Sequence, residues 1–114
     1  MTLIFKILET QAYNLAVAVG QFMGAEIDLK DGYIHFSTKE QVAETAAKHF
    51  AQRGDLMVMA VDTKHLGVAL KWEVSRAGQL FPHLYSPLIM RDILWARPLL
   101  WDGLKHVFPA ETFL

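Results

Sequence analysis

Short runs that are either apolar or alternate between apolar and polar residues predict the β-strands. Four runs have strand length, and one of them contains LMVMAV, a continuous apolar segment that is typical of a buried strand. The four runs are residues 3–8, 33–36, 55–62 and 68–75. The C-terminal third is rich in aromatic residues and proline, so we expect short, irregular or edge strands there.

Apolar side chains at helical spacing predict two helices in the N-terminal half. The first helix follows the first strand and extends to about Gly20 or Gly24. The second begins at a capping box near Thr38, where a hydroxyl residue is followed three positions later by Gln or Glu in either of two registers, and it ends at Gly54. Residues 25–32 are short and polar, and they predict a turn.

The order of these elements favours an α+β fold. Two early helices followed by several strands do not match a regular alternation of parallel strands and helices. We therefore expect small antiparallel or mixed β-sheets packed with two or three helices. At 114 residues, of which 53% are hydrophobic, the chain has room for one core, so residues 1–114 are predicted to form a single domain.

The charge pattern narrows the expected partners. The chain has 11 Lys and Arg against 12 Asp and Glu, and the basic residues are scattered. Binding to nucleic acid or to a membrane surface needs a clustered excess of basic residues, so we expect neither partner. We find no signal-peptide pattern and no apolar run near the ~20 residues that span a bilayer, and we therefore predict a cytoplasmic protein. The sequence leaves the oligomeric state open.

Polar side chains on otherwise apolar strands provide the candidate site. Along GYIHFST one strand face is apolar, while Tyr33, His35 and Ser37 share the opposite face. This polar face leads into the predicted start of the second helix, where unpaired backbone amides suit an anionic or carbonyl-bearing ligand. We therefore take His35, Ser37 and Thr38 as candidate ligand-binding residues.

Two later strands repeat this arrangement. In FPHLY, His83 and Tyr85 share a face, and in LKWEV the carboxylate of Glu73 lies opposite the apolar side chains. If the three faces converge, they form a cleft with two imidazoles, a phenol, a hydroxyl and a carboxylate. A structural alternative stays open, in which His35 and His83 bond to one another or to backbone.

Other chemistries have weaker support. The histidines and carboxylates show no HExxH or comparable spacing, and the chain has no cysteine, so no metal site is predicted. There is neither a GxGxxG segment after a strand nor a P-loop, so the sequence favours neither a Rossmann fold nor a P-loop nucleotide site.

Three segments resemble a bacterial family known as domain of unknown function 952. They are GYIHFSTKEQVAETAAKHF, LKWEVSRAGQLFPHLYSPL and WARPL. The resemblance implies a fold similar to the ADP-ribosyltransferases, which pack two small antiparallel sheets around a cleft for a nicotinamide dinucleotide. It also implies that His35 and Ser37 hold the ribose or amide, and that Tyr85 stacks on the nicotinamide.

The chain departs from those transferases at two positions. Phe36 stands where they often have a glycine, and Glu73 comes earlier than their catalytic glutamate, which lies on a late strand. Two hypotheses follow. The first is an enzyme that uses an NAD-like dinucleotide or another phosphoribosyl compound, with Glu73 and His83 as catalytic residues. The second is a non-catalytic ligand-binding module that acts as a sensor or accessory domain.

Overall fold

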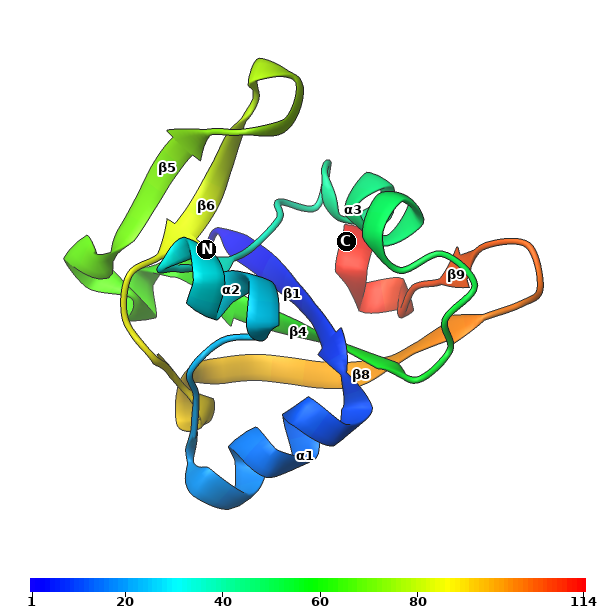
Figure 1. The fold of residues 1–114 in the computed structure, drawn as a ribbon, viewed down its shortest axis with the longest axis horizontal. Helices are drawn as coiled ribbons and strands as arrows, with labels where there is room; N and C mark the ends of the chain where they lie inside the picture. Colours follow the sequence, from blue (N-terminus) through cyan, green and yellow to red (C-terminus); the bar gives the residue numbers. More distant parts are fainter.

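The main β-sheet has four antiparallel strands, with β4 inside it (Figure 1). Its order is β1 (Leu3–Glu9), β4 (Leu56–Asp62), β8 (Ile93–Trp101) and β9 (His106–Val107). All seven residues of β4 are buried, which explains its unbroken apolar sequence. The computed structural model describes residues 1–114 and confirms the predicted α+β class.

Alternate residues of β4 pack into two separate core clusters. Met57, Met59 and Val61 belong to one cluster, and Leu56, Val58 and Ala60 belong to the other. Because successive side chains of a strand point to opposite faces, the main sheet has a packed layer on each side.

Two smaller sheets complete the strand pairing. One has the order β3 (Ile34–His35), β6 (Leu80–Leu84), β5 (Leu70–Val74), and the other pairs β2 (Gln21–Phe22) with β7 (Leu88–Ile89). β5 and β6 form a hairpin that projects from the body of the molecule (Figure 1).

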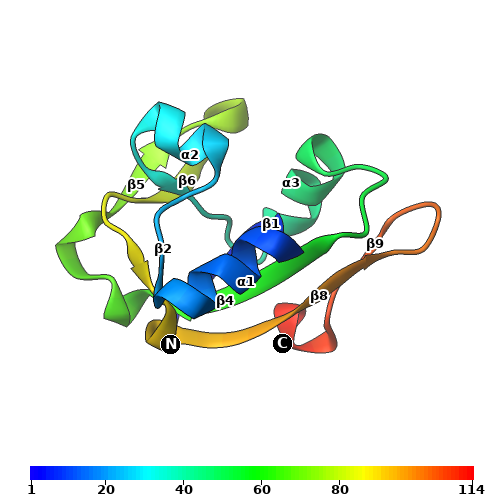
Figure 2. The same ribbon diagram turned by 60° about the horizontal axis from the view of Figure 1, so that its bottom comes forward.

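Three α-helices cover the sheets, and they are α1 (Thr10–Val19), α2 (Glu26–Asp31) and α3 (Val42–His49). α1 lies along β1 and β4, where Ala16 joins the first core cluster (Figure 2). α3 contributes Val42 and Ala46 to the second cluster. The connections include five 3₁₀ helices, at Thr63–His65, Gly67–Ala69, Arg76–Gly78, Met90–Asp92 and Ala110–Phe113.

Two local predictions are wrong. The polar segment predicted as a turn contains α2, whose first turn is fixed by Asp28, because its carboxylate accepts the Ala25 N–H at 2.8 Å. α3 runs from Val42 to His49, whereas the prediction placed this helix from Thr38 to Gly54. The capping contact is present, since Thr38 N–H donates to Gln41 Oε1 at 3.1 Å, but it closes the turn that precedes the helix.

The apolar face of the fourth predicted strand is largely exposed to solvent. Alternation places Trp72 and Val74 on this face, and their side chains are 43% and 69% exposed. Only the Leu70 end of that face meets the core, because the rest of the hairpin extends beyond the main sheet.

Candidate functional site

β3, β6 and β5 bring three of the predicted polar faces together. His35 and His83 are direct cross-strand partners, with ring centroids 5.5 Å apart. Glu73 lies on the neighbouring strand β5, and Tyr85 follows directly after β6. The two imidazoles, the phenol and the carboxylate expected from alternation therefore meet on one face of the small sheet.

Glu73 connects His83 and Tyr85 through one carboxylate oxygen. Its Oε1 lies 2.8 Å from His83 Nδ1 and also accepts the Tyr85 hydroxyl at 2.8 Å. The bond from His83, and then the bond from Tyr85, lower the pKa of the Glu73 carboxyl. The bond to Glu73 raises the pKa of the Tyr85 phenol. Near neutral pH Glu73 is therefore a carboxylate and Tyr85 a phenol.

The other ring nitrogen of His83 has no hydrogen-bond partner in the protein. The side chain is only 3% exposed. Among side-chain nitrogen and oxygen atoms that are fully buried, Thr112 Oγ1 alone lacks a hydrogen-bond partner. His83 Nε2 also lacks a partner, so it is not fully buried and keeps some contact with solvent. This nitrogen is thus free to bond a ligand, and it belongs to a ring that the surrounding residues hold in place.

Tyr33 lies at the centre of the aromatic side chains. Its ring stacks on His83 at 4.1 Å between centroids and lies 4.6 Å from His35 and 5.2 Å from Tyr85. Burial, and then the charges of nearby carboxylates, raise the pKa of its phenol. The sequence analysis did not select Tyr33, although alternation places it on the face of His35.

Asp28 is the buried centre of a second network. Its carboxylate, 1% exposed, bonds Lys6 Nζ at 2.9 and 3.0 Å, and it accepts the backbone N–H groups of Ala25 and His35. His35 Nδ1 lies 2.6 Å from the same carboxylate. Burial would raise the pKa of Asp28, but the bonds from His35 and Lys6 outweigh it and lower this pKa to about 2.

The sequence analysis missed this network. Lys6 is nearly as buried as Asp28, and burial lowers the pKa of its ammonium, although Asp28 opposes this. The available signal was a lysine inside the apolar segment IFKIL, which requires a buried acidic partner. The partner lies on α2, far along the chain, and it ties α2 to β1.

His35 has no free ring nitrogen. Nδ1 faces Asp28, and Nε2 lies 3.0 Å from Asp31. Because carboxylates only accept hydrogen bonds, Nδ1 donates to Asp28 in this geometry, and Nε2 lies beside a second carboxylate. His35 therefore presents its ring edge and face to the cluster, while His83 presents a nitrogen.

Ser37 and Thr38 are not brought into this cluster. The buried Ser37 hydroxyl bonds Thr45 Oγ1 of α3 at 2.9 Å, and the Thr38 N–H is used in the turn before that helix. The structure thus unites four of the six predicted site residues, which are His35, Glu73, His83 and Tyr85.

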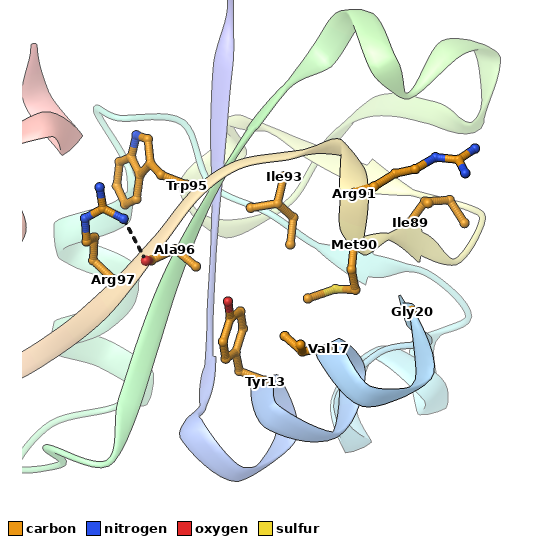
Figure 3. Close-up of a pocket in the computed structure, with 10 residues that line it drawn as sticks. All are labelled: Tyr13, Val17, Gly20, Ile89, Met90, Arg91, Ile93, Trp95, Ala96 and Arg97. Atoms are coloured by element: carbon orange, nitrogen blue, oxygen red, sulfur yellow. Dashed lines mark hydrogen bonds between the residues drawn. The ribbon is translucent and has the colours of Figure 1, made fainter.

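Two of the hollows on the surface matter for the candidate site. The smaller, about 210 Å³, is lined by Asp28, Tyr33 and Tyr85 among others, and it adjoins the polar cluster. The larger, about 730 Å³, lies between α1 and β8, where Tyr13 faces Ile93 (Figure 3). It contains no predicted site residue, and its charged side chains are Arg91 and Arg97, whereas the smaller hollow includes the predicted residue Tyr85.

No group of three or more His, Asp or Glu side chains converges closely enough to hold a metal ion. None of the helices has the length and apolar character that crossing a membrane would require. The absence of a nucleic-acid partner and the cytoplasmic location stay predictions from composition.

The fold and the polar cluster define a small α+β protein with an acid–base network on an edge sheet. The family described as "Protein of unknown function (DUF952)" matches residues 7–96, and the chain belongs to this family, as its sequence motifs predicted.

Solved structures extend this likeness to the whole chain. The crystal structure of Protein CC0527 from Caulobacter crescentus is 42% identical, with a TM-score of 0.94, over 99% of this chain and 100% of that one. Its solution NMR structure is 47% identical, with a TM-score of 0.82, over 90% and 89% of the two chains. No match was found among curated proteins.

Proposed function

We propose that this protein is an enzyme that uses His83 as a general acid–base on a small organic substrate held against Tyr33 and Tyr85. The observation that carries this proposal is the bond between Glu73 and His83 Nδ1, together with the unpaired Nε2. We further propose an NAD-like dinucleotide or another phosphoribosyl compound as the substrate class, following the resemblance to ADP-ribosyltransferases.

Glu73 prepares His83 for proton transfer. A carboxylate that accepts from Nδ1 keeps the proton of a neutral imidazole on that atom, which leaves the lone pair on Nε2. The same carboxylate stabilises the positive charge that forms when Nε2 takes up a proton from the substrate.

The aromatic side chains supply a binding surface for a planar ring. Tyr85 is 43% exposed, and Tyr33 is packed between it and His83. A nicotinamide or other flat heterocycle can stack on such rings. Both bonds to Glu73 use Oε1, so Oε2 stays free to face the positive charge that develops on a ribosyl carbon during bond cleavage.

A second candidate is the non-catalytic ligand-binding module. The saturated network of Asp28 favours it, because that network fixes His35 as part of the scaffold. In that case Glu73→Gln keeps ligand affinity and has no turnover to lose.

A thermal-shift titration with NAD, ADP-ribose, nicotinamide and glutathione tests the binding part of the proposal. At about a hundred times its dissociation constant a ligand adds ~2.7 kcal/mol to stability, which raises the melting temperature by several degrees. We expect a dinucleotide to produce this shift in the wild type and a much smaller one in Tyr85→Leu.

His65→Ala serves as the matched control, since this histidine lies outside the cluster on an exposed 3₁₀ helix, and its shift should equal that of the wild type. A dinucleotide shift that survives in Tyr85→Leu would remove the stacking role. If no compound shifts the wild type, the proposed substrate class is wrong.

A further inference from the structure

The outer edge of β5 carries backbone groups without partners. In the small sheet β6 lies between β3 and β5, and the carbonyl of Pro82 accepts the Phe36 N–H at 3.0 Å, so the backbone of Pro82 faces the β3 side. Alternate residues of an antiparallel strand direct their backbone groups to opposite neighbours. Trp72, the cross-strand partner of Pro82, therefore turns its own N–H and C=O toward the open edge.

The same edge carries an exposed apolar row. Trp72, Val74 and Leu80 are 43%, 69% and 53% exposed, and the register Val74–Leu80 and Trp72–Pro82 places them on one face of the hairpin. β5 is the outer strand of this projecting hairpin (Figure 1). An open strand edge beside exposed apolar side chains is a template for pairing with another strand.

The charges on β5 show which strand fits. Lys71 and Glu73 flank Trp72 on the opposite face from the apolar row. If a second β5 strand pairs antiparallel with its centre at Trp72, each Lys71 lies directly opposite the Glu73 of the other copy. Opposite charges directly across a ladder are favourable, and the two-fold axis produces this pair twice.

We propose that two copies of this chain pair through their β5 strands, antiparallel and centred on Trp72, so that their two three-stranded sheets become one continuous sheet. The pairing satisfies the free backbone groups of Trp72, and it brings the two Trp72 side chains together and places Val74 of each copy beside Leu70 of the other. The interface is isologous, and a closed dimer leaves neither β5 edge open for further growth.

This pairing adds a residue to the candidate site. Directly opposed side chains have Cβ atoms about 4.5–5.5 Å apart, so Lys71 of the second copy comes beside Glu73 on the face that carries His83 and Tyr85. Its ammonium supplies a cation for an anionic group of the substrate, such as a phosphate. This last step rests on the proposed function, whereas the dimer does not.

Charge exchange across the strand tests the dimer. We expect sedimentation equilibrium to show a dimer for the wild type, and a dimer dissociation constant raised by roughly tenfold or more in Lys71→Glu and in Glu73→Lys, because each places like charges opposite one another twice. The double variant restores opposite pairs and should return to within a few-fold of the wild type.

A second pair of variants keeps the test independent of the bonds that Glu73 makes within its own chain. Trp72→Lys places two ammonium groups together on the two-fold axis without removing any side-chain hydrogen bond, and it should be monomeric. Leu100→Lys alters a comparably exposed side chain on β8 and should stay dimeric. A monomeric wild type, a dimeric Trp72→Lys, or a double exchange that fails to recover would each overturn the proposal.

Discussion

Replacing Asp28 with alanine is expected to lower the free energy of unfolding by ~3–5 kcal/mol, because the variant leaves the ammonium of Lys6 buried without a partner. It also removes an acceptor from the first turn of α2 and from His35. Urea unfolding followed by circular dichroism measures this loss.

The double variant Lys6→Met with Asp28→Leu provides the control. Replacing both members of a buried pair by apolar side chains of similar size is often neutral, so the double variant should be more stable than Asp28→Ala. If Asp28→Ala costs less than about 1 kcal/mol, the buried pair does not anchor α2 as described.

The ionisation of Asp28 also makes the stability of the wild type depend on pH, with a defined sign. The pKa of Asp28 falls from its ordinary value of 3.8 to about 2 on folding. A depressed carboxyl pKa contributes stability that is present above pH 4 and is lost as the pH falls toward 2, by ~2 kcal/mol in total. Asp28→Asn should therefore lose less stability over this interval than the wild type.

The second large effect is expected on turnover. Once a substrate has been found by the ligand panel, His83→Ala should reduce kcat by 10²- to 10⁴-fold, the usual contribution of a general acid–base, while the dissociation constant for substrate changes little. Steady-state kinetics together with direct binding measurements separate these two quantities.

His106→Ala is a matched control for this experiment. His106 is also a buried histidine, and its Nε2 is paired with the Arg53 carbonyl on the far sheet. Its replacement should affect stability and leave kcat near the wild-type value. Equal losses of kcat in the two variants would show that His83 acts through folding rather than through chemistry.

The alternation of side chains predicted the candidate site better than it predicted packing. It placed His35, His83 and Tyr85 on faces that the register of the small sheet brings together. It could not show which face of β5 is covered, because that depends on how far the hairpin extends beyond the main sheet. Trp72 is therefore half exposed, although its strand pattern is that of a core residue.

Interactions between distant parts of the chain account for the other failures. α2 has six residues, too few for helical periodicity to appear, and the ion pair between Asp28 and Lys6 joins residues 22 positions apart. β4 could be predicted because its residues are apolar except for Asp62 at its end. Such a run indicates a buried strand without any knowledge of the strands that pair with it.

The tautomer of His83 tests the central claim most directly. Long-range ¹H–¹⁵N correlation spectra, recorded at a pH where the imidazole is neutral, distinguish a proton on Nδ1 from one on Nε2. We expect the proton on Nδ1 in the wild type, held by Glu73, and a shift toward Nε2 in Glu73→Leu. A wild-type His83 that carries its proton on Nε2 has no lone pair to offer a substrate there, and this result would contradict the proposed acid–base site.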